Sequence, residues 1–308
     1  MKRNARHLLR NLAAAIIACA GFTACSQDGL TDGTPLEEKT PLELTASHLY
    51  EAVATPQTRG TIDGNWEGAK TVAVRVNEKI KEYTATTGTD GKTMLTCNDI
   101  TEADTEFWWT KNGESKTVDA WYPYSEGQPE EWKVSSPQTA ESLVKEDLMC
   151  ASSTVVTQTG STIKFEHMLA KVVINLICNS DYLEKASKVE VSLTRQYQTG
   201  TLTNYGSVWN FSGKIGDSPN YTITAYESSP RATYQALVIP LSQGNPSIVI
   251  NVDGAKYSYT IKGVGSIFSG GNQYTFNITV KEEGLEVTVE ENIGWEEGNT
   301  GSGTVEID

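Results

Sequence analysis

Residues 165–178 read FEHMLAKVVINLIC, and the second half of this stretch begins the longest apolar run outside the N-terminal region. Val172, Ile174 and Leu176 recur at every second position, which places their side chains on one face of an extended chain. Their β-branched neighbours also favour a strand. We therefore expect a strand from Val172 to Cys178, with Val172, Ile174 and Leu176 facing a core.

Short runs of the same kind lie on both sides of this strand. They are separated by turn-forming pairs such as Asp90-Gly91, Asn112-Gly113 and Asp253-Gly254. Only residues 140–149 carry apolar side chains at helical spacing. The alternation of strands and turns predicts an all-β fold. The expected strands are residues 42–49, 71–76, 93–97, 118–122, 172–178, 188–193, 234–241, 247–252, 257–261, 274–280, 285–289 and 304–307.

The folded part of the chain is too long for one small sandwich and suits two, each with its own core. Residues 154–161 are polar and turn-like, and the long apolar run begins soon after them. We therefore expect two tandem β-sandwich domains, residues 60–160 and 161–308, that meet near Gly160.

The N-terminus has the features of a lipoprotein signal. Four basic residues precede a short apolar stretch, residues 12–20, which is too short to span a bilayer. Phe22-Thr23-Ala24-Cys25 resembles a lipobox, so residues 1–24 are expected to be removed and Cys25 to carry lipid. Ile16-Ile17-Ala18-Cys19 is a second match. Cys25 is preferred because the apolar run before Cys19 is very short and a polar tether follows Cys25.

Removal of residues 1–24 takes away four basic and no acidic side chains, and moves the formal net charge from −14 to −18. Such a surface repels phosphate backbones, so no nucleic-acid partner is expected. It also repels anionic lipid headgroups. The lipid on Cys25 is then the expected contact with the membrane.

The chain offers few residues for catalysis. Beyond the signal region it has two histidines, His48 and His167, without a partner at recognisable spacing, and it lacks a nucleophile elbow or phosphate-binding loop. Cys97, Cys150 and Cys178 lack metal-ligand spacing and are expected to be buried free thiols, although one disulfide among them stays open. We expect no enzyme activity, no cofactor and no metal.

Aromatic residues gather in the first half of the chain. They are expected to fill the core, although exposed rings would instead form a platform for sugars. The group comprises Phe107, Trp108, Trp109, Trp121, Tyr122, Tyr124 and Trp132.

Residues 165–172 carry the pattern F-x-H-x-L-A-K-V, which resembles a segment common in fimbrillins, the subunits of type V pili of anaerobic Gram-negative bacteria. The Ala-Cys-Ser end of the signal, the Thr58-Arg59-Gly60 site followed by Trp66, and Ile293-Gly294-Trp295 agree with this resemblance. It implies transthyretin-like sandwiches, export as an outer-membrane lipoprotein, and cleavage between Arg59 and Gly60 by an Arg-specific protease. Cleavage would remove the first strand, and a strand from another pilus subunit would replace it.

The first strand and a candidate donor strand are both visible in the residue pattern. Leu42, Leu44 and Ala46 alternate with polar residues within residues 25–59, the tether and removable strand. The donor is expected at the C-terminus, where Thr304, Val305, Glu306 and Ile307 alternate after a Gly-rich stretch.

These features predict a structural or adhesive pilus subunit at the cell surface, which joins a fimbria after processing. Its expected partners are other pilus subunits, the protease, the outer membrane and surface ligands of a host or of bacteria. The sequence leaves open whether the subunit belongs to stalk, anchor or tip. The alternative is a surface glycan-binding lipoprotein of a polysaccharide-uptake system, which would bind sugar on exposed aromatic rings.

Overall fold

The computed structural model describes residues 35–47, 70–88, 92–97, 99–177, 182–205, 208–242, 244–261, 268–281, 284–294 and 302–303. Within these residues the chain is almost entirely β-structure, as predicted, with two short helices, α1 (Ala140–Lys145) and α2 (Tyr182–Lys185). None of the described helices is long and apolar enough to cross a membrane.

The first part of the chain forms a barrel. Its strands follow the closed order β10-β2-β5-β4-β3-β7-β9. A small sheet of β1 (Pro35–Pro41) and β6 (Trp108–Lys111) lies beside it. The 3₁₀ turn η1 (Thr105–Phe107) immediately precedes β6. The barrel strands are β2 (Leu44–Ser47), β3 (Lys70–Val76), β4 (Lys79–Thr87), β5 (Thr93–Thr96), β7 (Ser115–Tyr122), β9 (Met149–Thr157) and β10 (Thr162–His167).

The second part is a sandwich, because residues of two sheets contribute to one core. The larger sheet has the order β16-β17-β11-β20-β21-β22, and the smaller one β15-β12-β18-β19. The strands of the larger sheet are β11 (Ala170–Ile177), β16 (Tyr226–Ser229), β17 (Thr233–Val238), β20 (Asn272–Lys281), β21 (Gly284–Gly294) and β22 (Ser302–Gly303). Those of the smaller sheet are β12 (Val189–Gln196), β15 (Tyr221–Thr224), β18 (Ser247–Val252) and β19 (Ala255–Thr260).

The apolar run that predicted the fold lies at the centre of the larger sheet. β11 pairs antiparallel with β17 and parallel with β20. Val172, Ile174 and Leu176 are buried, so their predicted inward orientation is confirmed.

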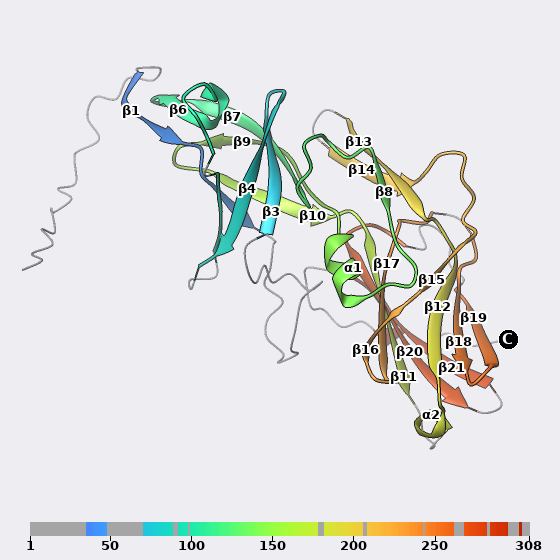
Figure 1. The fold of residues 1–308 in the computed structure, drawn as a ribbon. Coiled ribbons are helices and arrows are strands. Elements are labelled where there is room, and N and C mark those ends of the chain that lie inside the picture. The colour runs from blue at the N-terminus through green and yellow to red at the C-terminus, as the bar shows by residue number, and fades with distance from the viewer. Residues whose placement is uncertain are drawn as a thin grey trace, which may run out of the picture.

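A third sheet, β14-β13-β8, connects barrel and sandwich. Figure 1 shows its hairpin, β13 (Thr199–Tyr205) and β14 (Val208–Gly213), beside the junction of the two bodies, with β8 (Glu131–Lys133) next to it. Trp209 of β14 packs 6.2 Å from Trp121 of the barrel, measured between ring centroids, and its indole N–H donates to the carbonyl of Ala151 at 3.0 Å. The outer wall of the barrel thereby becomes part of the sandwich core.

Residues 154–157, which the sequence describes as turn-like, belong to a strand. β9 continues to Thr157, where a tight turn with Gly160 leads into β10. Polar side chains mark this stretch because one face of the β9–β10 hairpin is exposed, not because the chain leaves the sheet. The sheets change between His167 and Ala170, whereas the division of the chain into domains near Gly160 stays a prediction.

Helix α1 is shorter than the predicted residues 140–149. Thr139 and Ser142 form a capping box at its start, and Glu146 ends it. Met149 already belongs to β9, where it pairs with Tyr122 on one side and His167 on the other. Pairing on both sides outweighs the helical spacing of the apolar side chains.

Candidate functional site in the barrel

The residues to which the sequence assigned a function lie outside the described residues. These are the lipidation residue Cys25, the processing pair Arg59 and Gly60, and the donor residues Thr304, Val305, Glu306 and Ile307. Their roles stay predictions. The structure does describe the strand that processing would remove, and the surroundings of that strand form the candidate site.

Strand β2 closes the barrel. It pairs antiparallel with β5, where Leu44 faces Leu95, and parallel with β10, where Ala46 faces Ile163. Because β2 has a neighbour on each side, its loss would leave the facing edges of β5 and β10 without partners. We call the space between these two edges, continued along β6, the acceptor groove.

The side chains of the segment alternate as the sequence predicted. Leu42 and Leu44 are completely buried and Ala46 is nearly so, whereas Glu43 between the leucines is exposed. All three buried side chains belong to the core of the barrel, together with Leu95, Ile163 and Phe165. The segment is therefore part of the core, although it lies near the N-terminal end of the described chain.

The segment turns a corner at Leu42, between β1 and β2. Before the corner it pairs with β6, where Pro41 faces Trp108. At the corner the backbone N–H of Leu42 donates to the carbonyl of Phe107 at 2.8 Å, and the Tyr83 hydroxyl donates to the carbonyl of Leu42 at 2.9 Å. Both backbone groups of Leu42 are thus satisfied by residues that belong to neither β5 nor β10.

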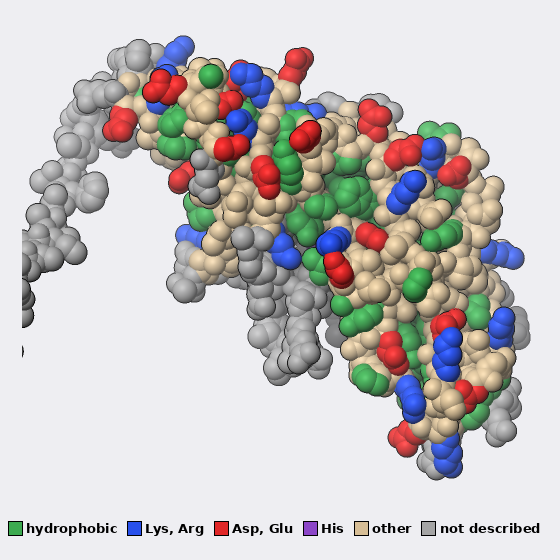
Figure 2. Space-filling model, viewed as in Figure 1, with side chains coloured by type: hydrophobic (Ala, Val, Ile, Leu, Met, Phe, Trp, Pro, Cys, Tyr) green, Lys and Arg blue, Asp and Glu red, His purple; other side chains and the backbone are tan. Residues whose placement is uncertain are grey.

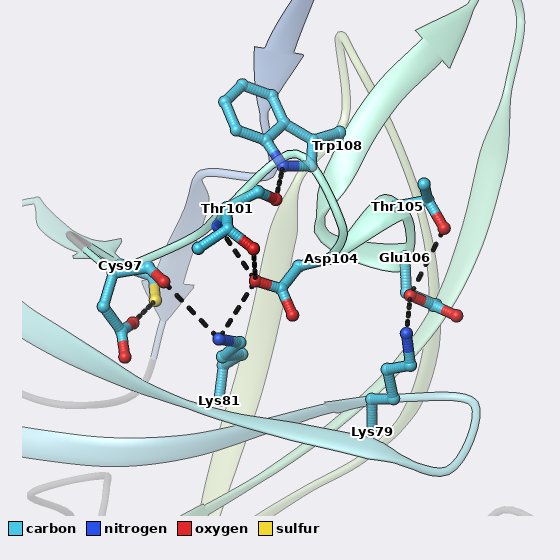
Figure 3. A network of polar contacts seen from close by, with 9 residues as sticks. Lys79, Lys81, Cys97, Thr101, Asp104, Thr105, Glu106 and Trp108 are labelled. Atoms are coloured by element: carbon cyan, nitrogen blue, oxygen red, sulfur yellow. Dashed lines mark hydrogen bonds and ion pairs between the residues drawn. The ribbon is translucent and has the colours of Figure 1, made fainter.

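A network of polar contacts holds η1 and β6 in place beside this corner (Figure 3). Lys79 and Lys81 of β4 form ion pairs with Glu106 and Asp104, at 2.8 and 3.1 Å. The Trp108 indole N–H donates to the carbonyl of Thr101 at 2.8 Å. These contacts tie the turn that presents the Phe107 carbonyl to the wall of the barrel.

Hydrogen bonds within this network shift the titration of one carboxyl group. The backbone N–H of Thr101, then its hydroxyl and the Lys81 ammonium, lower the pKa of Asp104 to about 2. Cys97 lies next to the network, and burial raises the pKa of its thiol to about 11. This thiol is a poor nucleophile at neutral pH, because only the thiolate reacts.

The two described cysteines, Cys97 and Cys150, are free thiols; the prediction of a buried free thiol is confirmed for Cys150, whereas Cys97 is free but not fully buried. Cys150 is buried and Cys97 is half-buried, whereas Cys178 and His48 lie outside the described residues. His167 is buried at the change of sheet, with Nδ1 2.9 Å from a carboxylate oxygen of Asp147. No cluster of metal-ligating side chains occurs among the described residues.

The aromatic residues of the first half lie in the cores or at their margins. Phe107, Trp109, Trp121 and Tyr122 are buried. Trp108, Tyr124 and Trp132 are half-buried. The prediction that these rings are structural is confirmed for the four buried residues. These four rings are therefore not exposed for stacking on a sugar.

Comparison with known proteins places this barrel and sandwich in a family. The profile of the fimbrillin-like family matches residues 58–295, which is more than half of the chain. The chain belongs to the fimbrillin-like family. Fimbrillins are pilus subunits, so membership supports such a role for this fimbrillin-like protein, with a cell-surface location and contacts to other pilus subunits.

Solved structures share the fold of this fimbrillin-like protein. A protein from Bacteroides uniformis assigned to cell adhesion has a TM-score of 0.63 and 17% identity, over 83% of this chain and 98% of that one. A second such protein, from Bacteroides ovatus, has the same TM-score and identity, over 84% and 98% of the two chains. No curated protein sequence matches this one.

Proposed function

We propose that this fimbrillin-like protein is a pilus subunit that assembles by strand exchange. It is exported as a lipoprotein with the lipid on Cys25, reaches the outer membrane, and is cut after Arg59 by an Arg-specific protease. The segment that contains β1 and β2 then leaves the acceptor groove. A strand from another subunit, for which the candidate is residues 304–307, takes its place.

The single observation that carries this proposal is the position of β2. The strand lies before Arg59 in the sequence, yet it closes the barrel between β5 and β10. Burial of a leucine side chain contributes about 1.5–3 kcal/mol, so exposure of the sites of Leu42 and Leu44 in an empty groove would cost about 3–6 kcal/mol. An empty groove therefore favours a new occupant with apolar side chains.

Cleavage acts through effective concentration. While the chain is intact, β2 is covalently joined to the strands that it pairs with, and a covalent link of this kind gives an effective concentration on the order of millimolar. A donor strand of another subunit at micromolar concentration does not compete with it. After cleavage the segment is held only by its own contacts, and exchange becomes favourable at high subunit concentration.

Treatment of the purified chain with an Arg-specific protease tests the proposal. The wild type should be cut after Arg59 and form fibres, whereas Arg59→Lys, which keeps the charge, should stay uncut and monomeric. Arg195→Lys is the matched control, because Arg195 is exposed in the sandwich and its replacement should leave cleavage and assembly unchanged. Fibres from Arg59→Lys that still require the protease would place the processing site elsewhere.

A further inference from the structure

The corner of the acceptor groove is held by one side chain. Tyr83 lies on β4 and is completely buried in the barrel core, with its ring centroid 6.3 Å from that of Phe107. Its hydroxyl reaches the carbonyl of Leu42 at the point where the segment leaves β6 and enters the barrel. This bond links the two halves of the groove.

We propose that Tyr83 is the positioning residue of the acceptor groove: its hydroxyl holds the corner carbonyl of whichever strand occupies the groove. This inference rests on the proposed strand exchange and adds the requirement that an incoming strand must meet. A strand that continues past the corner along β6 gains the hydrogen bond from Tyr83. A strand that lies only between β5 and β10 lacks it.

The surroundings of Tyr83 suit this task. Burial, followed by the negative charges around it, raises the pKa of its hydroxyl, which therefore stays a neutral donor at any physiological pH. When the segment leaves, the hydroxyl loses its partner in the core, and an unpaired buried donor is costly. The carbonyl of an incoming strand removes this cost whatever the side chain of that residue is.

The side chains that now fill the groove also indicate which residues an incoming strand needs. The corner residue and the second residue after it, Leu42 and Leu44, fill completely buried sites. The fourth residue after the corner is the small Ala46, which lies between Thr93 of β5 and Ile163 of β10. The preferred occupant is therefore an extended segment of another subunit with a large apolar residue at the corner, a second one two positions later, and a small residue two positions after that.

Peptide exchange tests the role of Tyr83. A recognition site for a sequence-specific protease is placed within residues 48–69 of the full chain, so that cutting does not depend on Arg59, and a labelled synthetic peptide of residues 35–47 serves as the probe. Loss of one buried hydrogen bond in Tyr83→Phe should raise the dissociation rate of the peptide about tenfold. Tyr122→Phe is the matched control, because this buried tyrosine of the same barrel donates to the carbonyl of Val144 instead.

A double-mutant cycle separates positioning from packing. A thioamide at Leu42 of the peptide replaces the carbonyl oxygen by sulfur, a weaker acceptor. It should weaken binding to the wild type and to Tyr122→Phe, and should have little further effect on Tyr83→Phe. Equal effects of the thioamide on all three proteins would overturn the proposal.

Failure of strand exchange itself gives a different result. If the cut wild type neither releases its segment nor takes up the peptide, the proposed exchange is wrong. The role of Tyr83 is then decided in the intact chain by amide hydrogen exchange. Tyr83→Phe must accelerate exchange of residues 42–46 relative to Tyr122→Phe, and identical rates would refute the positioning role.

Discussion

Asp104 connects its own loop, residues 101–104, to strand β4. It accepts hydrogen bonds from the backbone and hydroxyl of Thr101 and pairs with Lys81 of β4, next to the corner of the acceptor groove (Figure 3). The carboxylate is at the surface, where an ion pair alone contributes little. The two hydrogen bonds from Thr101 add to the contribution of the ion pair, so the Asp104 carboxylate stabilises the fold more than an isolated surface ion pair would.

The lowered pKa of Asp104 predicts how stability depends on pH. Because the folded pKa of about 2 lies below the ordinary value for Asp, folding favours the charged form. This contribution is present above the ordinary pKa and is lost as the pH falls toward 2. Asp104→Asn should lower the melting temperature at pH 7, and the difference from wild type in thermal melts should shrink steadily as the pH falls through the folded pKa of about 2. Glu102→Gln is the control, because Glu102 is exposed and lies two residues before Asp104. It should leave the melting temperature unchanged at pH 7 and near pH 2.

A second prediction at the scale of single residues concerns the lipid. Cys25 follows Phe22-Thr23-Ala24, the preferred lipobox, so fatty-acid labelling in a Gram-negative host should disappear in Cys25→Ser. Labelling should persist in Cys19→Ser, which alters the second match. The reverse pattern would move the lipid to Cys19.

Strand β2 is only four residues long, like its neighbour β5, and yet it closes the barrel. Its hydrogen bonds run to strands from two different parts of the chain, β5 and β10. Its two inward side chains, Leu44 and Ala46, supply the apolar contacts on one face. The outward Thr45 and Ser47 hydroxyls each donate one long hydrogen bond, to the sulfur of Met94 and to the carbonyl of Ile163. The strand is therefore held by a few identifiable contacts.

Single substitutions in β2 should separate these contacts. Leu44→Ala removes a completely buried side chain and should lower the free energy of unfolding by about 2–5 kcal/mol. Thr45→Ala, on the outward face, should change it by about 0.5 kcal/mol or less. Urea unfolding of the intact chain measures both. Equal costs for the two variants would mean that β2 is not part of the barrel core.

At the scale of the whole molecule, the two bodies are joined by packing as well as by the chain. The hairpin β13–β14 brings Trp209 against the barrel wall, so the outward side chains Ala73, Trp121 and Cys150 lie in the sandwich core. Basic and acidic side chains are interspersed over both bodies on the face shown in Figure 2. The acidic excess is thus not gathered into one patch on this face.

Deletion of residues 299–308 tests the donor at this scale. The truncated chain keeps the barrel and Arg59, so it should still be cut and should still accept a strand, but should not donate one. Mixed with an excess of cut wild type, it should end growing polymers and shorten the fibres seen by electron microscopy. Fibres of unchanged length, together with fibres from the truncated chain alone, would show that residues 304–307 are not the donor.

Local residue patterns alone were sufficient to predict several strands that bury one face. The runs at residues 247–252 and 71–76 match β18 and β3, and the alternation of Leu42, Leu44 and Ala46 correctly predicted which side chains of the first strand are buried. Strand β4 was missed. Its polar residues Lys79, Lys81 and Glu82 interrupt the apolar pattern, and its inward residues Tyr83 and Ala85 cover only its second half.

The sequence by itself determined that the protein is all-β, that its first strand has a buried face, and that residues 165–172 resemble those of fimbrillins. These features depend on side chains two residues apart or on a contiguous motif. Only the tertiary structure decided that β2 lies parallel to β10, that Tyr83 holds the corner at Leu42, and that Trp209 joins sandwich to barrel. Each of these contacts joins residues at least 41 positions apart in the chain. Because hydrogen bonding to a backbone carbonyl does not depend on the side chain of the acceptor residue, no local pattern encodes which donor will reach it.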